Sequence, residues 1–360
     1  MSSVHLSYTP ARPDALAPPL RVNLYSDTQT RPSEAMKQAM MHAELGDEQH
    51  GDDPTVHALC ERMAALMGKA AAVFLPSGTM CNEIALLTHC RRGDEVLAHA
   101  SAHIVTAEGG APGALAGVSV LGLDGPRGQF DVATLQAALR EPRRNVPPQT
   151  LVEIEQTANL GGGSVWPLDR LAAVCAAAHA AGMAVHMDGA RLMNAVVAAG
   201  VPAIEMAAGC DSVWLDFTKG LGAPLGAVLC GSAAFIDAAW QWKQRLGGSL
   251  RQAGICAAAC LYALDHNIDR LADDHANAAA LARGLAQLPG IVVEPPETNL
   301  VFFDTTAAGL TASALAGRLR RRGVQISTMG RFRARACTHL DVERDGIEIA
   351  LAATRAALAE

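Results

Sequence analysis

Short apolar runs alternate with amphipathic segments between residues 71 and 231. Apolar residues recur at helical spacing in three of these segments, residues 81–90, 131–140 and 167–182. The runs between them, which we predict to be strands, are residues 71–76, 95–100, 118–123, 150–155, 184–188, 212–217 and 227–231. Strands that are apolar throughout are buried on both faces. The pattern therefore predicts an α/β fold with a mostly parallel, seven-stranded sheet between layers of helices.

The two ends of the chain carry other patterns. Residues 21–32 predict a short strand that runs into a loop, and residues 32–46 and 54–68 predict helices that begin near a proline and end at a glycine. The C-terminal part predicts long helices over 232–247 and 251–290, strands over 291–296, 299–304 and 323–328, and a final helix. We therefore predict a flexible segment (residues 1–20), a large domain that includes an N-terminal helical arm (21–250) and a smaller C-terminal α/β domain (251–360).

Composition narrows the class of partner. Half of the 360 residues are hydrophobic, so the chain can bury a substantial core. The formal net charge is −7 and no run of Lys and Arg lies on one face, which argues against nucleic acid or an anionic membrane as a partner. We expect a small-molecule substrate and a second subunit instead.

Cysteine usage and the first residues bear on the cellular compartment. The nine cysteines are scattered and form no CxxC pair, which is typical of reduced, buried thiols. The first twenty residues are polar and interrupted by prolines, so they predict neither a signal peptide nor a membrane anchor. We expect a cytoplasmic protein.

Polar residues follow several of the predicted strands, at the end of the sheet where ligands of open α/β folds bind. Ser77, Gly78 and Thr79 follow the first run and precede a helix. Small hydroxyl side chains and a glycine at a helix N-terminus are suited to a phosphate group. Taken alone, however, this triplet is better explained as an ordinary helix N-cap.

Two further strand ends carry charged residues. Asp188 ends an apolar run and Arg191 follows it, so that a carboxylate could pair with a protonated ring nitrogen and a guanidinium with a substrate carboxylate. Lys219 follows another run, and a partly desolvated lysine can attack an aldehyde. The alternatives are a structural Asp–Arg pair and a surface lysine. Together with the triplet, in this order, they predict a site for pyridoxal 5'-phosphate (PLP).

Eight motifs spread over residues 21 to 345 carry a resemblance to a known family. They are YSDTQTRP, GDDPTV, FLPSGT, AHIVTAEGG, HMDGARLMNA, TKGLGAPLG, GGSLRQAGICAAA and THLDV. In these motifs the chain resembles the PLP-dependent L-threonine aldolases of low specificity. That resemblance implies the aspartate-aminotransferase fold and cleavage of L-β-hydroxy-α-amino acids to glycine and an aldehyde.

Imidazole chemistry makes His103 and His50 the candidate bases for the β-hydroxyl proton. The resemblance implies roles for other residues and a site that is shared within a dimer or tetramer. The remaining roles are Lys219 for the cofactor aldehyde; Asp188 for the ring nitrogen; Ser77, Gly78 and Thr79 for the phosphate; His103 for stacking on the ring; Ser26, Arg191 and Arg335 for the substrate carboxylate, with Arg191 also near the cofactor; and Arg251 for a phosphate in the neighbouring subunit.

The chain departs from the family pattern on the side of the β-hydroxyl. Gln156 and Ala158 replace an asparagine and a histidine, His50 replaces a tyrosine, and no histidine stands near Asn145, where some members have one. From these changes we expect a roomier, less polar pocket that accepts L-phenylserine as well as L-threonine and L-allo-threonine. β-Elimination or transamination of a related amino acid remains the alternative within PLP chemistry. A cofactor-binding regulator without turnover is the alternative outside it.

A metal centre is not expected. His99 and His103 are four residues apart, as two zinc ligands on one helix face would be. The glutamate of an H-E-x-x-H motif is missing between them, however, and no third ligand is evident.

Overall fold

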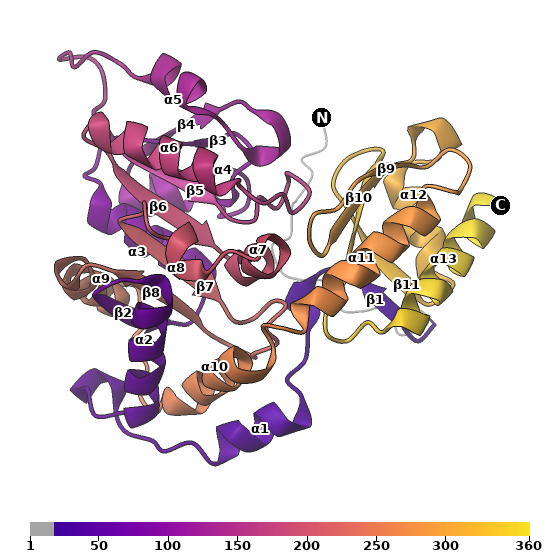
Figure 1. Cartoon of the computed structure of the whole chain (residues 1–360), viewed down its shortest axis with the longest axis horizontal. Coiled ribbons are helices and arrows are strands. Elements are labelled where there is room, and N and C mark those ends of the chain that lie inside the picture. Colours follow the sequence, from indigo (N-terminus) through magenta and orange to yellow (C-terminus); the bar gives the residue numbers. More distant parts are fainter. Residues whose placement is uncertain (1–17) are drawn as a thin grey trace, which may run out of the picture.

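The structure of the protein is a computed structural model that describes residues 18–360. Its larger sheet has seven strands in the order β2-β8-β7-β6-β5-β3-β4 (Figure 1). They are β2 (Ala71–Leu75), β3 (Glu95–His99), β4 (Ser119–Leu123), β5 (Gln149–Glu155), β6 (Ala184–Gly189), β7 (Ser212–Asp216) and β8 (Ala227–Gly231). All pairs from β4 to β7 are parallel, and β8 is antiparallel to both of its neighbours. The predicted mostly parallel sheet is confirmed.

Helices cover both faces of this sheet, as its apolar strands require. The helices of this part are α2 (Pro54–Met67), α3 (Gly78–His89), α4 (His103–Thr106), α5 (Val132–Ala138), α6 (Leu168–Ala180), α7 (Leu192–Ala199), α8 (Ala203–Met206) and α9 (Ala233–Arg245). α3 and α9 pack together over β2, β7 and β8, where Ile84 and Phe235 share a buried cluster with Trp214. α2 and α6 lie in the main core on the other face.

Local signals explain where these helices begin and end. Asp53 caps α2 by accepting hydrogen bonds from the backbone N–H groups of Thr55 and Val56, and Pro54 is its first residue. The helix ends at Gly68, whose φ of 62° is strained for any other residue. Both ends agree with the prediction from the sequence.

A second, five-stranded sheet has the order β1-β11-β12-β10-β9. Its strands are β1 (Val22–Leu24), β9 (Val292–Glu294), β10 (Leu300–Asp304), β11 (Val324–Thr328) and β12 (Arg333–Cys337), and its helices are α11 (Leu271–Leu285), α12 (Ala312–Arg320) and α13 (Arg344–Leu358). In β12, Ala334 and Ala336 enter the core beneath the helices, whereas Arg335 projects from the opposite face. β1 is parallel to β11, so the N-terminal strand belongs to the C-terminal sheet.

Two segments cross the domain boundary that the sequence suggested. The predicted helix over 251–290 is two helices, α10 (Gly254–His266) and α11, and α10 packs in the core of the larger sheet and against α1 (Glu34–Met41). β1 makes the opposite crossing (Figure 1). The division into residues 21–250 and 251–360 stays a prediction, and residues 1–17 of the expected flexible segment lie outside the described residues.

Between residues 18 and 360, no helix combines the length and the apolar character that crossing a membrane demands.

Candidate active site

The strand ends that the sequence singled out meet at one edge of the larger sheet. Glu155 pairs in register with Asp188 across β5 and β6, and Gly189 pairs with Leu215 across β6 and β7. β2 is antiparallel to β8, which is antiparallel to β7, so the end of β2 reaches the same edge. Residues that follow these four strands therefore surround one place, as expected for a ligand site of this class.

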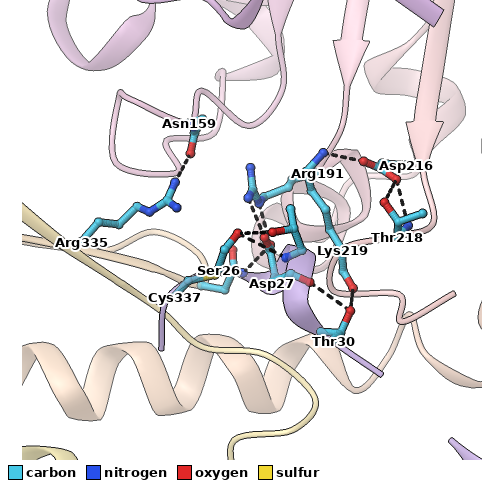
Figure 2. A network of polar contacts seen from close by, with 12 residues as sticks. Ser26, Asp27, Thr30, Asn159, Arg191, Asp216, Thr218, Lys219, Arg335 and Cys337 are labelled. Carbon is cyan, nitrogen blue, oxygen red and sulfur yellow. Dashed lines mark hydrogen bonds and ion pairs between the residues drawn. The ribbon is translucent and has the colours of Figure 1, made fainter. Parts of the chain in front are cut away.

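Lys219 lies just beyond β7 and is largely buried. Its Nζ is 2.5 Å from Oδ2 of Asp216 and 5.7 Å from the centroid of the Trp214 ring. Thr30 donates a hydrogen bond of 2.9 Å to the backbone oxygen of Lys219 (Figure 2). The residue is thus anchored at its backbone, and its side-chain amine is paired with a carboxylate. Asp216 was not among the predicted site residues.

The triplet that precedes α3 forms a small cradle beside this lysine. Ser77 is the N-cap of α3, and both Ser77 and Thr79 are exposed. A Cβ at Gly78 would lie 2.1 Å from the Trp214 ring, so only glycine fits there. Because Trp214 contacts both Gly78 and Lys219, the helix N-terminus and the amine lie close together.

Asp188 is almost fully buried at the end of β6. Its Oδ1 accepts a hydrogen bond of 3.0 Å from the backbone N–H of Ala190, and its Oδ2 accepts one of 2.9 Å from Asn82. Burial raises the pKa of Asp188, against the lowering effects of His103, Asn82 and Lys219. A carboxylate so placed gains from a cation at its open side, such as a protonated ring nitrogen.

His103 begins α4 near the same edge. Its Nδ1 lies 2.8 Å from Oε1 of the buried Glu108, and its backbone N–H donates to Oε2 of Glu155 at 3.0 Å. The hydrogen bond to Glu108 raises the pKa of His103. About a third of the side chain is exposed (36%), which leaves the ring a free surface for a flat ligand. His99 lies on β3 and not on the same helix as His103, so the two do not form a helical ligand pair.

The predicted carboxylate-binding residues lie where the two sheets face each other. Arg191 is buried, and its Nε and Nη2 donate to the two oxygens of Asp27 at 2.7 and 2.6 Å. Asn299 also donates to Asp27, at 3.1 Å. Asp27, which the sequence did not single out, therefore fixes the guanidinium of Arg191 and ties it to the C-terminal sheet.

Arg335 approaches from β12 of the C-terminal sheet. Its Nη1 donates to Oδ1 of Asn159 at 2.9 Å, and its Nε donates to the Ser327 hydroxyl at 3.1 Å. Burial and the charge of Arg191 lower the pKa of Arg335. Arg191 is already paired with Asp27, whereas among the described residues Arg335 hydrogen-bonds only to uncharged groups, so its guanidinium can still bind a carboxylate. Ser26, buried on the adjoining N-terminal segment, adds a hydroxyl to this region.

His50 and Arg251 lie apart from this group. Both are exposed, and Arg251 donates at 3.0 Å to Oδ2 of Asp47, the residue that caps the short helical turn Glu48–His50. The backbone N–H of Glu48 also donates to the oxygen of Arg251. The two residues are thus neighbours of each other on the surface of one chain, and their predicted roles stay predictions.

The expectation of a roomier pocket finds no support in the positions that suggested it. Ala158 is buried, and its methyl group is packed against the backbone turns at Gly128 and Gly161. Asn145 is exposed on the loop before β5, at the edge of the sheet opposite Asp188. A cavity of about 440 Å³ lies at that opposite edge, lined by Val146 and other residues of the loop. Neither departure therefore enlarges the site.

Buried carboxyl groups on α3 and β5 should give the apoprotein an unusual pH dependence. Burial and Glu108 raise the pKa of Glu83 to about 8, and burial raises that of Glu153 well above its usual range. Between about pH 5 and 8 the folded state therefore holds protons that the unfolded state has lost, so stability should fall as the pH rises, by up to about 1.4 kcal/mol per pH unit for each group.

Denaturant unfolding of the apoprotein at pH 6, 7 and 8 measures this effect. Glu83→Gln and Glu153→Gln should each flatten the decline, and Glu61→Gln on the exposed side of α2 should leave it unchanged. Stability that rises over this interval would contradict the assignment of neutral carboxyl groups.

The residues present fit the cofactor that the sequence predicts. A glycine-containing helix N-terminus suits a phosphate, a buried carboxylate suits a basic ring nitrogen, and a lysine amine beside a carboxylate suits an aldehyde. Trp214 packs against both the cradle and the lysine, and His103 offers a free ring face. The arginine pair suits an amino-acid carboxylate.

Comparisons with known proteins agree with this arrangement. The family model described as beta-eliminating lyase matches residues 23–308. A low-specificity L-threonine aldolase of Arabidopsis thaliana is 38% identical over 350 residues, which cover 94% of this chain and 96% of that protein. The low-specificity L-threonine aldolase of Escherichia coli K12 is 39% identical over 339 residues, which cover 94% and 99%.

Solved structures show the same fold. A threonine aldolase of Leishmania major superposes with a TM-score of 0.80 at 22% identity, covering 93% of this chain and 99% of that one. A putative L-allo-threonine aldolase of Listeria monocytogenes gives a TM-score of 0.79 at 22% identity, covering 94% and 96%. The fold predicted from the sequence is confirmed. From the family model and the two similar enzymes it follows that the chain belongs to the beta-eliminating lyase family, alongside the low-specificity L-threonine aldolases.

Proposed function

We propose that this protein is a PLP-dependent carbon–carbon lyase that cleaves L-β-hydroxy-α-amino acids to glycine and an aldehyde. The observation that carries the proposal is the meeting of Lys219, Asp188 and the Arg191–Arg335 pair around one sheet edge. The names of the similar proteins support L-threonine as a substrate. L-allo-Threonine and L-phenylserine complete the proposed set.

Each of these side chains has a task that its geometry supports. When bound, PLP supplies an electron-withdrawing ring that makes a bond to the substrate Cα easier to break. Lys219 holds the cofactor aldehyde, Asp188 holds the ring nitrogen in its protonated form, and Ser77, Gly78 and Thr79 hold the phosphate. Arg191 and Arg335 hold the substrate carboxylate and so fix the orientation of its Cα bonds.

A base must take the proton from the β-hydroxyl group. His103 and His50 are the two candidates, because an imidazole ring can accept a proton and return it. The hydrogen bond of Nδ1 to Glu108 fixes the ring of His103 and leaves Nε2 directed away from that acid. His50 is exposed on the short turn beside Arg251, so it would act only in a site completed by a second subunit.

Product analysis on three substrates tests the proposal. Purified protein loaded with PLP should release glycine with acetaldehyde from L-threonine and L-allo-threonine, and glycine with benzaldehyde from L-phenylserine. Ammonia and an oxo acid in place of glycine would establish the alternative of β-elimination. Tight PLP binding without any product would indicate a regulator.

We further propose that the active site is shared between two subunits, with Arg251 binding the phosphate held by its neighbour. Arg251 is exposed, and its guanidinium pairs with Asp47 and not with a residue of the Lys219 site, which supports this. Mixing inactive Lys219→Ala and Arg251→Ala chains should then restore activity, because one site of each mixed dimer contains both native residues.

A second pair of variants provides the control for this mixing experiment. Lys219→Ala and Asp188→Asn chains should not complement, because both residues belong to the same chain's half of the site. Subunit exchange is verified with chains of two different tag lengths. Failure of the first pair despite exchange would contradict the shared site.

A further inference from the structure

Asn82 lies on the buried face of α3, beneath the edge where the site forms, and has no role in the chemistry described above. It is fully buried and makes four side-chain hydrogen bonds. Its amide nitrogen donates to Oδ2 of Asp188 at 2.9 Å and to Oε1 of Glu108 at 2.8 Å. One side chain thus links the predicted partner of the ring nitrogen to the acid that holds His103.

The orientation of the Asn82 amide follows from its partners. Trp214 Nε1 can only donate, and it lies 2.7 Å from Oδ1 of Asn82. The carboxylates of Asp188 and Glu108 accept, so they require the NH₂ group on the other side. A flipped amide would place two donors against each other and an oxygen against two carboxylates.

The same orientation decides which atom donates in each hydrogen bond of a series of side chains that runs from Asn82 toward the surface. Burial lowers the pKa of His186 to about 3, so its ring is neutral. Its Nε2 lies 3.2 Å from Oδ1 of Asn82 and must donate, which leaves Nδ1 to accept from the Ser212 hydroxyl at 2.8 Å. His89, whose pKa burial lowers to about 4, then donates from Nε2 to the Ser212 oxygen at 2.8 Å.

Every donor in this chain therefore points toward Asp188. His89 donates to Ser212, Ser212 to His186, His186 to Asn82, and Asn82 to the carboxylate. Such an arrangement stabilises the ionised form of a buried carboxyl group, which burial alone would favour as the neutral acid. A neutral Asp188 could not hold a ring nitrogen in its protonated form.

We propose that Asn82, backed by His186, Ser212 and His89, is a positioning residue that keeps Asp188 ionised and aimed at the cofactor ring nitrogen, and that through Glu108 it sets the place of His103. The proposal rests on the proposed PLP-dependent function. Asn82 touches neither substrate nor the reacting atoms, so its effect is exerted through Asp188 and Glu108.

A comparison of two cofactors isolates this role. The apoprotein is titrated with PLP and with 1-deaza-PLP, in which a carbon replaces the ring nitrogen. Asn82→Leu should weaken PLP binding about tenfold, the effect of losing one hydrogen bond to a charged group, and should weaken 1-deaza-PLP binding far less. A purely structural role for Asn82 would weaken the binding of both compounds equally.

Two further variants keep the test decisive. Ser212→Ala removes the hydroxyl that donates to His186 and leaves Asn82 in place. It should shift the ratio of the two dissociation constants in the same direction as Asn82→Leu, by a smaller factor. This test remains available even if Asn82→Leu fails to fold. Asn277→Leu removes a half-buried amide that donates to the Val342 oxygen in the C-terminal part, and it should leave the ratio unchanged.

The outcomes separate this inference from the function on which it rests. Equal losses for both compounds in Asn82→Leu and an unchanged ratio in Ser212→Ala would overturn the role of Asn82 while leaving the lyase intact. A native apoprotein that binds neither compound would overturn the proposed function, and the inference with it.

Discussion

Replacing Lys219 with alanine should lower kcat/KM for L-threonine by roughly 10⁴-fold or more, the scale observed when an enzyme loses its central nucleophile. The residue is the lysine whose Nζ meets Asp216 at the sheet edge, beside the helix N-terminus suited to the phosphate. Methylamine added to the variant should restore part of the activity, because it replaces the missing amine.

The position of the cofactor bond gives an independent check. Borohydride treatment of the native PLP-loaded protein should attach the cofactor to Lys219, and peptide mapping identifies the modified residue. Lys243 is the informative comparison, because it is fully buried on α9 and paired with Glu48. Cofactor found on Lys243, or normal turnover in Lys219→Ala, would contradict the assignment. Lys37→Ala, on the exposed face of α1, serves as the control.

The larger sheet could be predicted because its strands are recognisable as apolar segments of the sequence. β7 is buried along its whole length and appears as an apolar run. β5 and β6 are also largely buried, so apolar residues dominate both, although Glu153 and His186 interrupt the runs. The positions of Asp188 and Lys219 follow from the same pattern, because functional residues stand where such runs end. The sequence alone therefore supplied both the fold class and these two positions.

β12 was not predicted, because it does not form an apolar segment. One of its faces is buried in the C-terminal core and the other meets the larger sheet, so arginine alternates with alanine and no apolar run forms. The turn at Asn267 that separates α10 from α11 was missed as well, because no glycine or proline marks it. Tertiary packing, and not the local sequence, therefore determines both the strand β12 and the break between α10 and α11.

Partners that lie far apart in the sequence were the other omission. Asp27 is 164 residues from Arg191, and Asn82 is 106 residues from Asp188. Nothing in the local pattern of either segment indicates the pairing, because a short polar side chain near a strand or helix end has many possible uses. Packing of α3 against β6 and β7 brings Asn82 to Asp188, and the position of β1 in the C-terminal sheet brings Asp27 to Arg191.

Asp188→Asn should lower kcat by about 10²-fold or more, the scale for removing a group that stabilises charge in the transition state. The amide is uncharged, so it cannot keep the ring nitrogen protonated. It also has a single acceptor oxygen, whereas Asp188 accepts from both Ala190 and Asn82. One of these two donors would lose its partner, and the variant side chain would be held less firmly.

The same substitution should affect folding far less than it affects turnover. Because burial raises the pKa of Asp188, keeping this group ionised costs the apoprotein stability as the pH rises, and the asparagine avoids that cost. The gain offsets the lost hydrogen bond, so the unfolding temperature of the apoprotein should stay close to the native value at pH 8. Steady-state kinetics and thermal unfolding on one preparation separate the two effects. A loss of turnover that merely follows a loss of folded protein would remove Asp188 from the ring nitrogen, as would a variant with native kcat at neutral pH.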